Sequence, residues 1–340
     1  AGCQHSCRWH TRRTRIKMLK RLLRDRWSVV STLRLPLLIV ARYYKTFHQI
    51  RDLVSQLDSK QIDRTTFLKT DASKRLFTER INYADIGARD GLLEFLKPFE
   101  KLLNTIFFEP DVEEFKQMQE KYENKKIQII NSAVSDSNSI KSLFLTKKRG
   151  GSSLLHPSGS MIGLMAIGSD GTSRFSVENI VDVATQRLDE AVNYEDTKIE
   201  LLKIDTQGSE YEILSALGEH RPFLICAECA TTEIYKGQRT LFAVGSLLEN
   251  LGYFPIHLMD GHLLPKTSSN WRNSTQLYGD VFFVPDNSTN GRAIIERDVE
   301  KWFASLCMHG FMDFALWQLD ELKLFKPPLV TQTEQLLKNN

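Results

Sequence analysis

The stretch Asp85-Ile-Gly-Ala-Arg-Asp-Gly91, set between a short apolar run and a helical pattern, decides the fold. Glycine has no Cβ, so a turn of this composition lets the backbone pass close to a bound ligand. In open α/β folds, ligands bind at the carboxyl ends of the strands, where this turn places the carboxylate of Asp85. We therefore expect Asp85, Gly87 and Gly91 to bind a cofactor, with the acid facing an ammonium group. The competing interpretation is a tight strand-to-helix turn without a ligand.

Short apolar runs alternate with helical patterns along most of the chain from this first strand onward. The runs that predict strands are Ile81–Ile86, Thr105–Phe108, Ile127–Ile130, Ile199–Ile204, Phe223–Ala227, Tyr253–His257 and Asp280–Val284. The segments that predict helices are Leu92–Phe99, Val112–Tyr122, Glu210–Leu217 and Thr240–Leu251. Such alternation favours parallel strands joined by helical crossovers on both faces of a sheet. The predicted fold class is therefore α/β, with a seven-stranded, mostly parallel, doubly wound sheet.

The chain divides into four parts by composition and pattern. We predict that residues 1–17 are a disordered or non-native tail. Residues 18–80 predict a helical extension, residues 81–285 the main domain, and residues 286–340 a helical appendage at the carboxyl end. Residues 147–173 are rich in Gly and Ser, and a loop of that length indicates a lid, a binding loop or a disordered insert.

Charge is concentrated near the amino end of the chain. The net charge of +3 is too small to indicate a nucleic-acid partner, and we predict none. Residues 17–27 form a basic amphipathic pattern, which favours either weak contact with an anionic membrane surface or a solvated helix packed on its domain. The five cysteines are scattered and do not form a disulfide framework, so we expect a reducing, cytoplasmic compartment.

Acidic residues follow the second and third predicted strands. Glu109 comes 24 positions after Asp85, close to the roughly 20-residue interval at which an acid binds the ribose hydroxyls of an adenosine cofactor. Ala133 and Asp136 follow the third strand, where a backbone amide and a carboxylate suit the adenine base. Three successive strand ends thus supply groups for the amino-acid, ribose and base parts of such a cofactor.

The glycine spacing separates two classes of adenosine cofactor. Dinucleotides favour the pattern G-x-G-x-x-G, which, counted from Gly87, needs glycine at positions 89 and 92. Arg89 and Leu92 stand there instead. The spacing therefore disfavours an NAD-dependent oxidoreductase, which stays as an alternative.

The run Leu202-Lys-Ile-Asp-Thr-Gln-Gly-Ser-Glu210 resembles the K-I-D-x-E-G-x-E signature of the FkbM family of S-adenosylmethionine-dependent O-methyltransferases. Further similar segments, in the order of the family, are Asp85–Ala88, Phe108–Pro110, Ala133–Asp136, Gly150–Leu154, Arg187–Asp189 and Glu228. The resemblance covers about residues 80 to 285. It implies a Rossmann-like class I methyltransferase fold, S-adenosyl-L-methionine as cofactor, and methyl transfer to a hydroxyl, often on a sugar or a glycosylated natural product.

Two departures from the family pattern fall near the expected site. Arg89 and Asp90 stand where an Asn and a small residue are usual, and Gln207 replaces the usual Glu. The resemblance therefore implies an altered pocket, and one carboxylate fewer for any mechanism that needs that charge.

Asp205 is the predicted general base. An aliphatic hydroxyl is a poor nucleophile at neutral pH, so a base within hydrogen-bond reach accelerates its methylation. Lys203, two residues earlier on the same face of the strand, is expected to orient Asp205 or to contact the acceptor. The alternative is that Asp205 only caps the following helix. We predict no metal, although Asp205, Glu228 and Asp189 at neighbouring strand ends could gather around a divalent cation.

A small-molecule or carbohydrate acceptor is the expected partner, and no pattern indicates an oligomeric state. The Gly- and Ser-rich segment and the terminal helices, which we expect to shape the acceptor pocket, carry no recognisable chemistry. The alternative from a different class is a non-catalytic module that keeps the fold and binds the cofactor without turnover.

Overall fold

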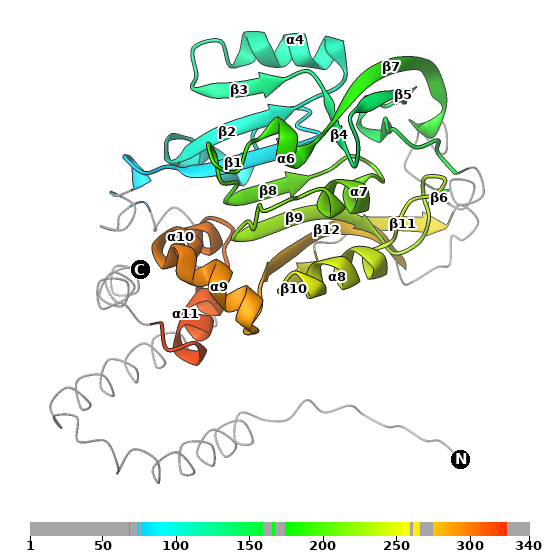
Figure 1. The fold of residues 1–340 in the computed structure, drawn as a ribbon. Helices are drawn as coiled ribbons and strands as arrows, with labels where there is room; N and C mark the ends of the chain where they lie inside the picture. Colours follow the sequence, from blue (N-terminus) through cyan, green and yellow to red (C-terminus); the bar gives the residue numbers. More distant parts are fainter. Residues whose placement is uncertain are drawn as a thin grey trace, which may run out of the picture. The chain divides into compact units, whose positions relative to one another are not determined.

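The central sheet places the glycine-containing turn near the middle of its strand order (Figure 1). The computed structural model describes residues 68, 74, 76–158, 165–166, 174–258, 261–265 and 275–324. The predicted tail, the basic segment 17–27 and most of the predicted amino-terminal extension lie outside the described residues. Residues 325–340, the end of the predicted carboxyl-terminal appendage, also lie outside them.

The seven predicted strands are all present in one mixed sheet. They are β1 (Ile81–Ile86), β2 (Leu103–Phe108), β3 (Ile127–Ile130), β8 (Leu201–Ile204), β9 (Leu224–Ala230), β10 (Tyr253–Leu258) and β12 (Thr275–Pro285). Strands β3, β2, β1, β8 and β9 pair in parallel in that order, and β12 joins β9 in the antiparallel direction. β12 pairs with β10 over one half and with β11 (Gly261–Pro265) over the other, and β6 (Met165–Ala166) adds to β11.

The two strands at the centre of this sheet are buried. All four residues of β8 are buried, and so are five of the six in β1. Parallel strands covered on both faces carry nearly continuous apolar runs, which is why the sequence marks them clearly. Asp85 and Lys203 are the charged exceptions, and they stand directly opposite each other in the β1–β8 pairing. This ion pair therefore lies among the buried apolar residues of the core.

Helices cover both faces of the sheet. The 3-10 helix Glu94–Leu102 and α4 (Val112–Lys121) connect β1 to β2 and β2 to β3, whereas α7 (Glu210–Ser215) connects β8 to β9. Because parallel crossovers are right-handed, connections that run in opposite directions along a sheet lie on opposite faces. Figure 1 shows α7 and α8 (Leu241–Asn250) in front of the sheet, and the two helices pack against each other. The predicted fold class, α/β with a doubly wound sheet, is confirmed.

Three helices follow the last strand, where the sequence predicts a helical appendage. They are α9 (Thr289–Arg297), α10 (Val299–Met308) and α11 (Met312–Glu321). α10 packs against β9 and the 3-10 helix, and its Trp302 is fully buried. These helices belong to the same compact unit as the sheet, residues 62–340. Among the described residues, no helix is long and apolar enough to cross a membrane.

A second, three-stranded sheet stands beside the central one and is absent from the sequence predictions. β4 (Ala133–Ser135) pairs in parallel with β7 (Val177–Arg187), and β5 (Ser139–Thr146) pairs with β7 in the antiparallel direction. The sequence conceals it because only two of the eleven residues of β7 are buried, and acidic and polar residues are mixed with its apolar ones. Four buried residues of this sheet form an apolar cluster: Ala133, Leu143, Leu145 and Val183.

Candidate active site

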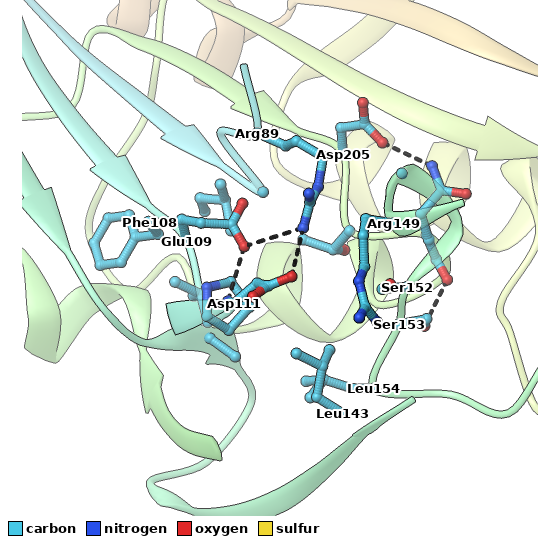
Figure 2. A pocket seen from close by; sticks show the side chains of 18 of the residues that line it. Arg89, Phe108, Glu109, Asp111, Leu143, Arg149, Ser152, Ser153, Leu154 and Asp205 are labelled. Atoms are coloured by element: carbon cyan, nitrogen blue, oxygen red, sulfur yellow. Dashed lines mark hydrogen bonds and ion pairs between the residues drawn. The ribbon is translucent and has the colours of Figure 1, made fainter. Parts of the chain in front are cut away.

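A pocket opens at the carboxyl ends of β1, β2 and β8 (Figure 2). It occupies about 840 Å³, including the space open to solvent. The strand ends form one wall, and β4, β5 and residues 149–154 form the other. Of the predicted site residues, the structure places four on the pocket lining (Gly87, Glu109, Ala133 and Asp205) and four off it (Asp85, Gly91, Asp136 and Lys203).

Gly87 lets the first turn lie against the end of β8. Its φ is +78°, a backbone conformation that favours glycine. A Cβ at this position would stand 2.1 Å from the carbonyl oxygen of Asp205, which is shorter than any real contact. The N–H groups of Gly87 and Ala88 both donate to the carbonyl of Phe108, at 3.0 and 3.1 Å. The turn therefore holds the ends of β1, β2 and β8 close together around one pocket.

Gly91 and Asp85 support the turn from outside the pocket. Gly91, with a φ of +79°, passes so close to Tyr122 that a Cβ would stand 2.1 Å from the phenol oxygen. Asp85 is fully buried, and its two oxygens accept hydrogen bonds from Tyr83 Oη at 2.7 Å and from Lys203 Nζ at 3.1 Å. Protein donors thus occupy both carboxylate oxygens of Asp85.

Lys203 joins the acids of β1 and β8. Its ammonium lies 3.1 Å from Asp85 Oδ1 and 3.7 Å from Asp205 Oδ2, and its side chain is 9% exposed. Burial alone would lower the pKa of Lys203, but the carboxylates of Asp85 and Asp205 outweigh it and raise the pKa above its usual value. Lys203 is therefore charged at physiological pH and offsets the negative charge of both neighbours.

Glu109 ends β2 with its carboxyl group buried in the pocket wall. Its Oε1 accepts the N–H of Asp111 at 2.9 Å and lies 3.9 Å from the Arg89 guanidinium. Burial raises the pKa of Glu109 to about 7, against the partial opposition of that hydrogen bond and of Arg89. Glu109 therefore changes its charge near neutral pH, which makes its ionisation sensitive to a ligand that binds beside it.

Arg89 reaches across the pocket to the acids at the start of α4 (Figure 2). It pairs with Asp111 at 3.0 Å and with Glu114 at 2.9 Å. Asp111 also accepts the N–H of Glu113 and so caps α4. The sequence identifies Arg89 only as a departure from a family pattern, because its partners lie 22 and 25 positions away. In the structure it fastens the glycine-containing turn to the start of α4.

Ala133 and Asp136 occupy different surroundings, although both follow β3. Ala133 is buried and lines the pocket. The Asp136 side chain is 50% exposed and accepts a hydrogen bond from Lys141 Nζ at 3.1 Å. That hydrogen bond, more than any other neighbour, lowers the pKa of Asp136. The structure thus brings Ala133, and not Asp136, together with Gly87 and Glu109.

Gln207 holds the carboxylate of Asp205 in place. Its Nε2 donates to Asp205 Oδ1 at 2.9 Å and also to Glu228 Oε2, while its Oε1 accepts from Tyr235 Oη at 2.9 Å. Burial, together with repulsion from Asp205, raises the pKa of Glu228 well above its usual range. An amide bridges two acids here, at a point where a third carboxylate would repel both. In the sequence, Gln207 is recognisable only as a replacement of the usual Glu, and nothing there predicts that it bridges Asp205 and Glu228.

The carboxylate of Glu210, the first residue of α7, organises the turn between β8 and that helix. Its Oε1 accepts the N–H groups of Thr206 at 3.1 Å and Gly208 at 3.0 Å. No side chain caps α7 at its N-cap Ser209, and Asp205, considered as a helix cap from the sequence, lines the pocket with its side chain 34% exposed. The carboxylate of Asp205 is therefore available for chemistry.

The acids considered for a divalent cation do not converge. Asp189 pairs with Arg187 at 2.8 Å, and Gln207 stands between Asp205 and Glu228. Within the part of the chain that the structure describes, no group of three or more His, Cys, Asp or Glu side chains could hold a metal ion.

Solved structures of methyltransferases resemble the chain at low sequence identity. A candidate RNA methyltransferase from Pyrococcus horikoshii is 11% identical, over 63% of this chain and 83% of its own, with a TM-score of 0.31. Precorrin-6y C5,15-methyltransferase from Geobacter metallireducens is 10% identical, over 63% and 86%, with a TM-score of 0.31. The 1,6-didemethyltoxoflavin-N1-methyltransferase of Burkholderia thailandensis, solved with 1,6-didemethyltoxoflavin and S-adenosylhomocysteine, is 10% identical, over 75% and 92%, with a TM-score of 0.29.

The family comparison spans the glycine-containing turn, the strand ends and the pocket. The Methyltransferase FkbM domain matches residues 85–255, which is half of the chain and includes every predicted site residue. No curated protein matches the sequence. With its strand order, its pocket and its signature residues in one matched segment, the chain belongs to the FkbM methyltransferase family.

Proposed function

We propose that the chain is an S-adenosyl-L-methionine-dependent O-methyltransferase whose acceptor is a hydroxyl on a sugar, a glycan or a glycosylated natural product. The observation that carries the proposal is the carboxylate of Asp205, which lines the pocket beside the glycine-containing turn and does not cap α7. A positioned base is what an aliphatic hydroxyl needs, because it is a poor nucleophile at neutral pH. The carbohydrate class rests on the family resemblance.

The pocket fits the proposed cofactor. Gly87 leaves bare backbone at the turn, and the buried carboxyl group of Glu109 suits the ribose hydroxyls. Ala133 and its apolar neighbours Val134 and Leu143 suit the adenine base. S-adenosyl-L-methionine supplies, when bound, an electrophilic methyl group on a positively charged sulfur.

Asp205 accepts the proton of the acceptor hydroxyl in this proposal. Its Oδ1 is held by Gln207, whereas its Oδ2 lies 3.7 Å from the Lys203 ammonium, beyond hydrogen-bond distance. Oδ2 is therefore the oxygen that takes the proton. Gln207 and Lys203 are positioning residues, because they fix the orientation of the base. A fixed orientation of reacting groups supplies much of the acceleration in transfers of this kind.

Calorimetry and a transfer assay test the proposal together. We expect S-adenosylmethionine and S-adenosylhomocysteine to bind and NAD not to bind. With the methyl group labelled, we expect label on glycosides that carry a free hydroxyl, and none on matched glycosides in which hydrogen replaces that hydroxyl. Binding of NAD without either sulfur compound would contradict the cofactor assignment. Label on amine acceptors alone would contradict O-methylation, and binding without turnover on any acceptor would favour a non-catalytic module.

Affinity for the cofactor is expected to depend on the ionisation of Glu109. An ionised carboxylate accepts both ribose hydroxyls, whereas the protonated acid keeps one oxygen as a donor. Because the pKa of Glu109 is raised to about 7, the binding form is depleted as the pH falls through neutrality. We expect affinity for S-adenosylhomocysteine to be roughly tenfold weaker at pH 6 than at pH 8. In the Glu109→Gln variant the affinity for S-adenosylhomocysteine should not vary with pH over this range. If that variant keeps the pH dependence of the unaltered protein, ionisation of Glu109 is not its cause.

A cytoplasmic location is part of the same proposal. Cys226, Cys229 and Cys307, the cysteines within the described residues, are free and buried. Burial raises the pKa of all three thiols, which keeps them protonated and unreactive. Free buried thiols suit a reducing compartment. Cell fractionation of the tagged protein tests this location, and recovery in a secreted fraction would contradict it.

A further inference from the structure

Arg149 enters the pocket from the segment that follows β5. It begins a single 3-10 turn, Arg149–Gly151, and Figure 2 shows its side chain beside Ser152 and above Leu154. The Nη1 atom of its guanidinium is buried and has no hydrogen-bond partner among the residues that the structure describes. Buried N–H groups almost always find an acceptor, because an unsatisfied one costs free energy. Since this one lines a pocket, a bound molecule can supply the acceptor.

The charges around the pocket distinguish Arg149 from Arg89. The guanidinium of Arg89 is paired with Asp111 and Glu114, so its donors are satisfied within the protein. Arg149 shares the pocket with these groups, but no acid in the described part of the chain pairs with it. A guanidinium presents its donors as a rigid fork that matches the two oxygens of a carboxylate or phosphate. Arg149 is therefore a cation available to an anionic ligand.

Ser152 adds a second donor on the same turn. Its N–H donates to the carbonyl of Arg149 at 3.0 Å, which fixes the two residues relative to each other. Its Oγ accepts the N–H of Thr146 at 3.1 Å, so the hydroxyl proton is directed elsewhere. The next residue, Ser153, instead donates its hydroxyl to the carbonyl of Gln207 at 2.8 Å. Of these two serines, Ser152 is the one whose hydroxyl can serve a ligand in the pocket.

We infer that Arg149 and Ser152 form a subsite for an oxyanion, of the carboxylate kind, on a molecule that binds in this pocket. The inference rests on the proposed function and deepens it. Two sources offer such a group there: the amino-acid part of the cofactor, and an acidic acceptor such as a uronic acid. The acids that line the pocket suit the positively charged groups of the cofactor. Arg149 supplies the positive charge that a carboxylate on the ligand needs.

The first experiment compares two nucleosides that differ in the carboxylate. S-adenosylhomocysteine carries the amino-acid group, and 5′-methylthioadenosine keeps the adenosine and the thioether without it. If the cofactor is the source, Arg149→Met lowers the affinity for S-adenosylhomocysteine by about 10- to 100-fold in calorimetry and leaves methylthioadenosine unchanged. The Arg149→Lys variant keeps the charge but loses the planar fork of donors, so its affinity for S-adenosylhomocysteine should lie between those of Arg149→Met and the unaltered protein. Lys147→Met removes an exposed charge two positions away and should match the unaltered protein.

The second experiment compares glucuronate with glucose by saturation-transfer NMR, on protein saturated with S-adenosylhomocysteine. If the acceptor is the source, glucuronate binds more strongly than glucose, and Arg149→Met removes that difference while the nucleoside affinities stay the same. Unchanged binding of every ligand in Arg149→Met would overturn the inference. So would an equal loss for both nucleosides, since that pattern indicates a general change in the pocket.

Failure of the proposed function gives a different result. If the unaltered protein binds neither nucleoside, the cofactor assignment fails, and glucuronate binding to the free protein then tests the subsite by itself. Thermal unfolding of each variant separates loss of the subsite from loss of the fold. Because Arg149→Met removes a buried guanidinium nitrogen that has no hydrogen-bond partner, the melting temperature of this variant should not fall, and Arg149→Lys supplies the second variant if it does.

Discussion

Asp205→Asn is expected to reduce methyl transfer by about 100- to 10,000-fold, the range over which a general base contributes. The amide has nearly the same shape as the carboxylate but cannot take the proton of the acceptor. Gln207 still has an oxygen at position 205 to bond, so the pocket keeps its form. Affinity for S-adenosylhomocysteine should therefore be unchanged in calorimetry, while single-turnover transfer to a hydroxyl acceptor is lost.

A matched control for this variant is Asp182→Asn. Asp182 is an exposed acid on β7 that bonds the hydroxyl of Ser142 and does not line the pocket. The Asp182→Asn variant should transfer methyl groups at the rate of the unaltered protein. Normal turnover in Asp205→Asn would leave Asp205 without a role as base. A loss of both turnover and cofactor affinity would indicate instead that Asp205 shapes the pocket.

Glu109→Ala is expected to weaken the binding of S-adenosylhomocysteine by about 100-fold, because it removes the acceptor for two ribose hydroxyls. The fold should tolerate the change. Burial raises the pKa of Glu109 to about 7, so its charged form is held in the protein at a cost. Calorimetry measures the affinity, and thermal unfolding checks that the variant is folded.

The control for Glu109→Ala is Glu114→Ala. Glu114 pairs with Arg89 at 2.9 Å but does not line the pocket. If Glu109 acted only by neutralising Arg89, the two variants would lose affinity to a similar degree. We expect Glu114→Ala to retain it, and equal losses would contradict the ribose assignment.

The central sheet could be predicted because burial on both faces imposes continuous apolar runs. The strands at Ile81–Ile86 and Ile127–Ile130 have the predicted bounds, and the turn at Gly87 is recognisable from its composition. Beyond the parallel strands the signal weakens. The predicted strand Asp280–Val284 extends in the structure over Thr275–Pro285, where one half pairs with β11.

The contacts that define the site could not be predicted, because they depend on register and on partners far apart in sequence. Lys203 appears from spacing alone to be a partner of Asp205, yet its closest acid is Asp85, directly opposite on β1. Gln207 meets Tyr235 at a separation of 28 residues. The donor properties of Arg149 follow only from what surrounds its guanidinium in three dimensions.

The two walls of the pocket come from separate sheets, which has a consequence for how such an enzyme diversifies. The strand ends are built into the main core, where substitutions disturb many buried neighbours. The opposite wall rests on the smaller apolar cluster around Leu143 and on β7, of which only two residues are buried. Mutations can therefore reshape that wall with less disturbance of the main core. One wall of the pocket can thus vary in sequence while the other is inherited intact.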